Sequence, residues 1–226
     1  MYILHYAPDN ASMIVRLVLE AHTLPYRTEL VDRRRNQQQS PAYLALNPMG
    51  LIPTLVTPLG PISETAAILL WLADRHGLAP DVTHPKRPAL LQWLAFLSNT
   101  AHAELRQIFY PDRYVPQAAL VGHHQIMTAR MGQHFGLLNR ATAEQADLFA
   151  PAGILAPYVC ALLRWAVLYP RGQEPWFSLG QFPDLQRLAL ALQDTPQAQS
   201  VALAEGLGPQ PFTAPAYPTP SEGSAT

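Results

Sequence analysis

The chain has little of several features that would assign it to a class at once. Its 226 residues include one cysteine, Cys160, which excludes an internal disulfide and any zinc or redox motif built on paired cysteines. Charged residues make up 14% and the formal net charge is −1, so nothing in the electrostatics indicates nucleic acid or an anionic membrane as a partner. No apolar run is long enough to cross a membrane, because Arg164 interrupts the most apolar segment.

A targeting segment is also missing from the sequence as it begins here. The start, MYILHYAPDN, has neither the basic region nor the long apolar core of a signal peptide. We therefore expect a cytoplasmic protein with no membrane partner. The length is sufficient for two modest domains or one large one.

The first 76 residues alternate short β-prone and helical segments. The expected order is a strand at Met1–Tyr6, a helix from Ser12, a strand at Tyr26–Val31, a short helix at Ser40–Leu46, a strand at Thr54–Val56, a strand after the turn at Gly60, and a helix at Glu64–Arg75. This β-α-β-α-β-β-α order predicts a thioredoxin-like α/β domain.

The rest of the chain reads as helical. Residues 77–87 contain Pro80 and Pro85 and are followed by Pro88, and with their weak periodicity they predict a linker. Residues 88–207 predict an all-α domain with helical patterns over Pro88–Phe109, Ala118–Arg140, Pro157–Tyr169, Phe182–Leu192 and Gln197–Leu207. Residues 208–226 are rich in Pro, Ser, Thr and Gly, and we expect a disordered tail.

Two motifs about ten residues apart suggest a binding site. Ile52-Pro53 precedes a β-prone segment, and a proline there must lie at an edge or turn, with its predecessor extended. Ser63-Glu64-Thr65 opens an apolar helix, where free N–H groups and hydroxyls suit a carboxylate. Together they predict a site for a peptide-like, zwitterionic ligand.

The motifs NPMGLIPTL and SETAAIL, followed by a helical half, resemble the cytosolic glutathione S-transferase family. The resemblance runs from about Tyr2 to about Leu207 and is closest in look to bacterial beta-class and related proteobacterial members. It implies a homodimer that holds glutathione as co-substrate, without a metal, in the first domain. A small hydrophobic electrophile would lie in the second.

The resemblance assigns roles to the glutathione-binding residues. Ile52 resembles the residue whose backbone pairs with the cysteinyl part of glutathione, and Pro53 resembles the family's cis-proline. Glu64 and Thr65 resemble the pair that binds the γ-glutamyl end. The alternative for both motifs is structural: a plain turn proline and an ordinary helix start.

The residue beside the sulfur is less determined. Where beta-class enzymes usually carry a cysteine, this chain has Ala11. Ser12 comes next and resembles the serine of serine-type relatives, so we expect its hydroxyl to stabilise the glutathione thiolate as the catalytic group. A plain N-cap is the alternative for Ser12, and Tyr6 and Asn10 are alternatives for the catalytic role.

Two further positions follow from the resemblance. His102 resembles a beta-class histidine over the glutathione sulfur, although a polar histidine on a helix is an equal interpretation. Arg35, or its neighbour Arg33 or Arg34, resembles the basic residue near the glycine carboxylate. A solvated basic loop is equally consistent with these arginines.

The second domain offers an electrophile pocket and one departure from the family. Tyr110, Arg113 and Tyr114 follow the long helix where related proteins line that pocket, although core packing explains the aromatic residues as well. The usual Ser/Thr-x-x-Asp capping box is replaced by Gly-Ile-Leu-Ala at residues 153–156, with Pro157 next.

Three functions remain compatible with the sequence. The first is a transferase that conjugates glutathione to a hydrophobic electrophile. The second is a non-catalytic or weakly active binding or regulatory protein on the same fold. The third is a glutathione-dependent thiol oxidoreductase, against which the missing loop cysteine argues.

Overall fold

The computed structural model describes residues 1–219, and its first part is a four-stranded sheet with helices. The strands are β1 (Tyr2–Tyr6), β2 (Tyr26–Leu30), β3 (Thr54–Thr57) and β4 (Gly60–Ser63), in the order β2-β1-β3-β4. The β1 and β2 strands are parallel, and the other two pairings are antiparallel. The helices are α1 (Ser12–Ala21), α2 (Pro41–Leu44) and α3 (Thr65–His76). The element order is the expected thioredoxin-like one.

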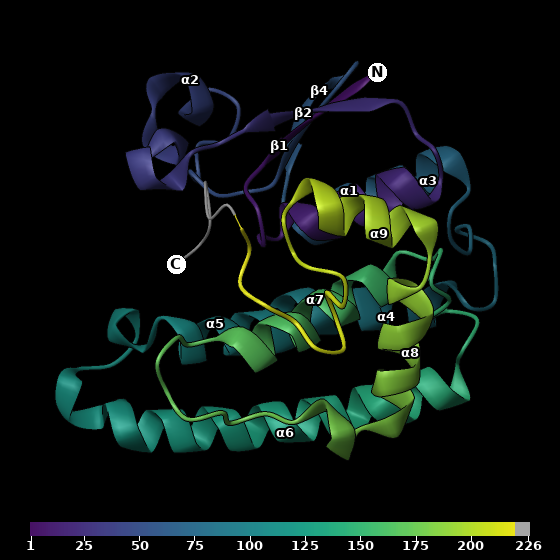
Figure 1. Ribbon diagram of the computed structural model, residues 1–226. Helices are drawn as coiled ribbons and strands as arrows, with labels where there is room; N and C mark the ends of the chain where they lie inside the picture. Colours follow the sequence, from purple (N-terminus) through teal and green to yellow (C-terminus); the bar gives the residue numbers. More distant parts are fainter. Residues whose placement is uncertain (220–226) are drawn as a thin grey trace.

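The remaining elements are helical (Figure 1). They are α4 (Arg87–Ala95), a π-helical stretch (Phe96–His102), α5 (Ala103–Phe109), α6 (Leu120–Glu144), α7 (Leu155–Leu168), α8 (Pro183–Gln193) and α9 (Pro196–Ala204). The single long helix expected at 88–109 is thus three consecutive segments. The fold class predicted from the sequence, an α/β domain followed by an all-α domain, is confirmed.

Helix α7 forms the centre of the helical half. All but one of its residues are buried, and apart from Arg164 its sequence is apolar on every side, as expected for a helix enclosed by others. No side chain caps its first turn, where Ile154 occupies the N-cap position. The missing capping box therefore has no side-chain substitute, and packing has to supply the stability of α7.

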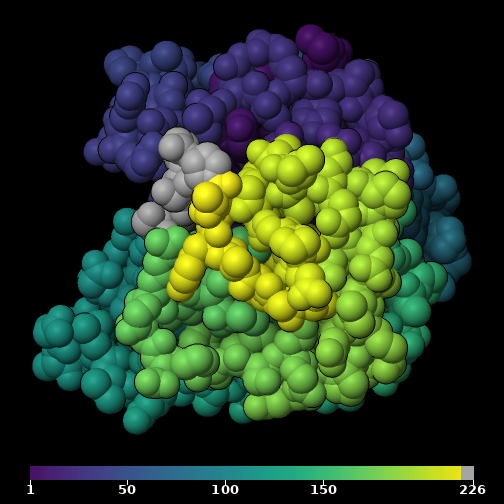
Figure 2. All heavy atoms as spheres, viewed as in Figure 1, coloured from purple at the N-terminus to yellow at the C-terminus, as the bar shows by residue number. Residues whose placement is uncertain are grey.

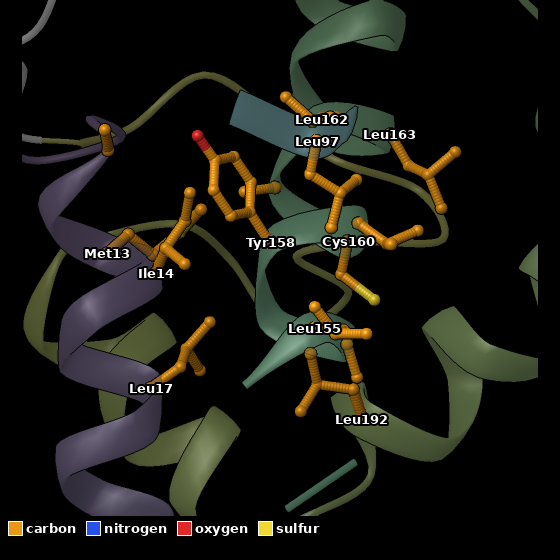
Figure 3. Close-up of a cluster of buried hydrophobic side chains, with 14 of the residues drawn as sticks. Met13, Ile14, Leu17, Leu97, Leu155, Tyr158, Cys160, Leu162, Leu163 and Leu192 are labelled. Atoms are coloured by element: carbon orange, nitrogen blue, oxygen red, sulfur yellow. The ribbon is translucent and has the colours of Figure 1, made fainter. Parts of the chain in front are cut away.

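The two halves share one hydrophobic core. Helix α1 packs against α3, α7 and α9, and Figure 3 shows Met13, Ile14 and Leu17 of α1 facing the side chains of α7. The ring of Tyr158 lies in this cluster, with its hydroxyl at the margin. This shared core fixes the first domain against the second, and a site between them is held on both sides.

The segment after α9 corrects one expectation from the sequence. Residues 208–219 are ordered: Phe212 is buried, and the backbone N–H of Phe212 and of Thr213 donates to Gln193 Oε1. The hydroxyl of Tyr217 donates to the carbonyl of Leu168. Figure 2 shows this segment in yellow, lying across the helical half below the first domain. The rest of the expected tail, residues 220–226, lies outside the described residues.

Candidate functional site

The loop before β3 presents an extended backbone to a cavity. The peptide bond between Ile52 and Pro53 is cis. The carbonyl of Leu51 accepts hydrogen bonds from the Tyr43 hydroxyl and the Asn47 side chain, both at 2.7 Å, so the loop is anchored. Within the described chain, the N–H and C=O of Ile52 make no hydrogen bond. They remain available for a peptide-like ligand.

The start of α3 lines the same cavity. Glu64 is exposed and has a positive φ of 68°, a strained conformation for a residue other than glycine. No side chain caps the helix, so the N–H groups of its first turn at Thr65, Ala66 and Ala67 lack helical partners and suit an anion. A carboxylate acceptor and a set of amide donors therefore lie side by side.

His102 faces this cavity from the helical half. The Nδ1 atom lies 3.1 Å from the hydroxyl of Tyr158, and the His102 ring lies against Trp165, with ring centroids 5.2 Å apart. Burial, with a smaller contribution from the charge of Arg106, lowers the pKa of His102 to about 4. The imidazole is therefore neutral at physiological pH. Burial also raises the pKa of Tyr158, which keeps its proton.

These groups surround one cleft. Its first cavity, of about 580 Å³, is lined by Ile52, Pro53, Glu64, Thr65 and His102, among others. A second cavity of about 270 Å³ adjoins it, because Ala11, Leu51, Ile52, His102 and Arg106 line both. The structure thus brings together five of the residues that the sequence assigned to one ligand.

Ser12 lies outside the cleft, contrary to the expectation for a thiolate donor. Its side chain is fully buried, and its hydroxyl donates to the carbonyl of Ala7 at 3.2 Å and accepts from the Ala7 N–H at 3.3 Å. It does not cap α1 either, since Ala11 occupies the N-cap position without a side-chain hydrogen bond. Ser12 instead holds the preceding loop in shape.

Asn10 and Tyr6 are the alternatives to Ser12 for the catalytic role beside the sulfur. Asn10 lines the second cavity, but its side chain accepts a hydrogen bond from the Ala11 N–H at 2.8 Å. Tyr6 lines neither cavity, and the guanidinium of Arg16 lies over its ring. Of the residues considered beside the sulfur, His102 is the one with a side chain at the junction of both cavities.

Two of the three residues expected in the electrophile pocket line the second cavity. Tyr110 and Arg113 line it, whereas Tyr114 does not and is 47% exposed. Arg35 is also outside: its side chain is 86% exposed and pairs with Asp32 at 3.4 Å. The weighed alternative Arg33 lines the cavity instead. The basic loop forms a 3₁₀ turn at Arg33–Arg35, which turns adjacent arginines in different directions.

Sequence reasoning missed a buried polar network next to the cleft. The carboxylate of Asp9 accepts from Arg164 Nε at 2.8 Å, from Trp165 Nε1 at 2.9 Å and from the Tyr169 hydroxyl at 2.8 Å. The Asp9 N–H donates to Glu205. One signal could have found it: an arginine inside an all-apolar helix requires a buried acidic partner.

Two classes of site are not found in the part of the chain that the structure describes. Residues 1–219 contain no group of three or more His, Cys, Asp or Glu side chains arranged to hold a metal ion. No helix within them is both long and apolar enough to cross a membrane. Cys160 is buried in α7, and burial raises the pKa of its thiol. That thiol is not a nucleophile for the cleft.

Comparisons with known proteins find similarity to glutathione S-transferases. The family model "Glutathione S-transferase, N-terminal domain" matches residues 11–75. Glutathione S-transferase GST-4.5 of Xanthomonas campestris pv. campestris is 32% identical over 52% of this chain and 58% of its own. Disulfide-bond oxidoreductase YfcG of Escherichia coli is 30% identical over 57% of this chain and 64% of its own. The matched stretches thus span less than two thirds of either relative.

A solved structure extends the likeness to almost the whole chain. The glutathione transferase homologue from Sulfitobacter, with bound glutathione, superposes with a TM-score of 0.74 over 90% of this chain and 98% of its own, at 22% identity. At this low identity, the superposition shows a shared fold alone. The similarity in sequence comes from the family model and the relatives. Residues 11–75 therefore belong to the glutathione S-transferase N-terminal domain family, and the sheet half and the helical half together have the fold of the glutathione transferases.

Proposed function

We propose that the protein is a glutathione transferase that binds glutathione in the cleft and joins it to an electrophile. One observation carries the proposal: the free backbone of Ile52, the Glu64–Thr65 helix start and His102 line a single cavity. A zwitterionic peptide needs an acceptor for its ammonium, donors for its carboxylate and a backbone partner. The Glu64 carboxylate, the Thr65 end of the helix and the Ile52 backbone meet those three needs, and His102 remains for the sulfur.

The roles proposed for the binding residues follow from their chemistry. Glu64 accepts from the ammonium of the γ-glutamyl end, and Thr65 with the neighbouring amides holds its carboxylate. Ile52 pairs with the cysteinyl backbone beside Pro53. Arg33, rather than Arg35, pairs with the glycine carboxylate, because Arg33 lines the second cavity.

His102 is the proposed donor to the glutathione sulfur. We assign the Tyr158 hydroxyl, which keeps its proton, as the donor to His102 Nδ1; in that tautomer the neutral imidazole carries its proton on Nε2. That N–H donates to the sulfur and favours the thiolate, which is the attacking form. In the reaction the thiol proton passes to solvent, a carbon–sulfur bond forms, and the leaving group departs with its electron pair.

Retention on immobilised glutathione and a conjugation assay with an aryl chloride test the proposal. We expect retention and turnover, and we expect Glu64→Ala to abolish retention. Retention without turnover would favour the alternative, a non-catalytic binding or regulatory protein. Absence of retention by the unaltered protein would overturn the glutathione assignment.

Disulfide reduction is a second candidate, favoured by the relative named Disulfide-bond oxidoreductase. Because Cys160 is buried, the thiol in such a reaction has to be that of glutathione itself. Its thiolate would attack one sulfur of a disulfide, form a mixed disulfide and release the other sulfur as a thiolate. Following both aryl chloride conjugation and reduction of a small dialkyl disulfide, with the same protein sample, separates the two reactions.

Assembly and location are also proposed. We propose a cytoplasmic homodimer, as the family resemblance implies. The exposed apolar side chains of Leu51 and Leu91 beside the first cavity support a partner on that face. Light scattering after size exclusion tests the dimer, with a monomer mass as the contrary result.

A further inference from the structure

Within residues 1–219, the second cavity carries positive charge that no carboxylate neutralises. Arg33, Arg106 and Arg113 line it from three different elements. Among residues 1–219, none of these three guanidinium groups makes an ion pair, whereas Arg35 is held by Asp32. Three unpaired arginines around one small cavity are unusual in a chain with only 15 lysines and arginines and a net charge of −1.

The acidic residue that lines this cavity does not cancel them. Asp9 is buried, and its two carboxylate oxygens accept hydrogen bonds from Arg164 at 2.8 and 3.3 Å. Arg164 lies behind Asp9 and does not line the cavity, so the charge of Asp9 is balanced from within the core. His102 adds no charge, because its pKa is lowered to about 4. The cavity therefore has an excess of cations.

The same cavity has an aromatic wall. Phe109, Tyr110, Trp165 and Tyr169 line it. The guanidinium of Arg113 lies 4.8 Å from the centroid of the Tyr110 ring, in a cation–π contact. Aromatic rings accept a flat apolar body, and an arginine fork binds a carboxylate through two parallel hydrogen bonds. The aromatic rings can thus contact the apolar body of an aromatic acid, while the arginine binds its carboxylate.

Glutathione accounts for only part of this charge. Its glycine carboxylate takes one cation, which the proposed binding mode assigns to Arg33 on the sheet half. Arg106 on α5 and Arg113 on the turn after α5 both belong to the helical half and remain for a second ligand. We infer that Arg106 and Arg113 select a second substrate with an aromatic body and a carboxylate group. The inference rests on the proposed transferase function.

A matched pair of electrophiles tests this selection. The probes are para-chloro-dinitrobenzoate and its neutral methyl ester. With either probe the glutathione sulfur bonds to the ring carbon that bears chlorine, and chloride leaves with the bonding electrons. Each kcat/KM is divided by the rate constant of the same probe with glutathione in buffer, which removes the difference in intrinsic reactivity.

We expect the normalised kcat/KM to favour the benzoate over the ester by about tenfold or more, as for one charge-assisted hydrogen bond. Arg106→Gln and Arg113→Gln should each lower this preference several-fold, because the benzoate rate should fall more than the ester rate in both variants. Arg140→Gln is the control, because Arg140 is exposed on α6 and lines neither cavity. It removes the same net charge and should leave the preference unchanged.

A binding measurement keeps this test independent of catalysis. Dinitrobenzoate and dinitrobenzamide lack a leaving group, and their binding to the protein saturated with S-methylglutathione can be followed by quenching of tryptophan fluorescence. Tighter binding of the acid, lost in Arg106→Gln and Arg113→Gln, supports the inference even if no conjugation occurs. Equal or weaker binding of the acid, or a preference unchanged in both variants, would overturn it while leaving glutathione retention as evidence for the proposed function.

Discussion

The side chains of Asp9 and Arg164 form an ion pair between the two halves of the molecule, with both groups fully enclosed. Arg164 Nε donates to Asp9 Oδ1 at 2.8 Å, and the same guanidinium donates to backbone carbonyls of residues 207, 211 and 216. The pair thus joins the loop before α1, the centre of α7 and the segment after α9. It fixes the position of Ala11, at the edge of the cleft, relative to the aromatic wall of the second cavity.

Removing one member of this pair should destabilise the protein strongly. Arg164→Met leaves the Asp9 carboxylate buried without a cation, and the expected loss in the free energy of unfolding is about 3–5 kcal/mol. Urea denaturation measures it. Arg187→Met is the control, because Arg187 is exposed and pairs with Asp184, and it should cost less than about 1 kcal/mol. Similar losses in the two variants would show that the buried pair stabilises the protein no more than an exposed pair does.

The stability of the protein should depend on pH through Glu205. Burial, opposed in part by Arg16, raises the pKa of Glu205 to about 7, against an ordinary value of 4.5. Between these values the folded state binds a proton that the unfolded state has lost, so this group's contribution to stability falls as the pH rises from 4.5 to 7. The slope is at most about 1.4 kcal/mol per pH unit.

The variant Glu205→Gln isolates this effect. It keeps an oxygen to accept from the Asp9 N–H but cannot ionise. Urea midpoints at several pH values from 5 to 8 should decline less for the variant than for the unaltered protein. Parallel curves would show that Glu205 does not titrate in this range.

The neutral state of His102 predicts the pH dependence of conjugation. Since its pKa is lowered to about 4, the rate between pH 5 and 8 should follow one ionisation, that of the glutathione thiol. His102→Phe removes the donor and should raise this apparent pKa by about one unit, with roughly a tenfold lower rate at neutral pH. Tyr158→Phe, which frees the choice of tautomer, should shift the pKa in the same direction by less. An unchanged profile in both would remove His102 from the mechanism.

Ser12→Ala should leave conjugation unchanged, the opposite of what the sequence alone predicts. The Ser12 hydroxyl bonds to Ala7 and does not reach the cleft. Loss of that buried hydrogen bond should lower the free energy of unfolding by about 1–2 kcal/mol. Steady-state kinetics and urea denaturation of the same variant check both statements. A tenfold lower kcat with unchanged stability would restore the hydroxyl to the site.

Ser12 and Arg35 show where sequence reasoning failed. The fold and the positions of Ile52, Pro53, Glu64 and Thr65 were predictable, because local motifs fix a turn before a strand and the start of a helix. The direction of a side chain in a turn depends on a few backbone torsions. Ser12 points inward to a loop, and a 3₁₀ turn gives the cavity Arg33 instead of Arg35.

Long-range partners were beyond the sequence for a different reason. The Asp9–Arg164 pair and the packing of residues 208–219 depend on segments far apart in the chain. A proline-rich composition indicates low helix and strand content, but it does not exclude a segment that is fixed by hydrogen bonds from buried side chains. Arg164 and Gln193 supply those bonds here.

Glu64 should show a conflict between stability and binding. Its φ of 68° costs about 1 kcal/mol or more in a residue with a Cβ atom and little in glycine. Glu64→Gly is therefore expected to keep or raise the free energy of unfolding while glutathione retention is lost. Glu64→Gln keeps the strain and removes only the charge, so it should weaken binding without a gain in stability. Calorimetric titration with glutathione and urea denaturation give the two quantities for each variant. If Glu64→Gly binds glutathione as the unaltered protein does, the strained backbone serves no ligand, and the γ-glutamyl end has to be assigned elsewhere.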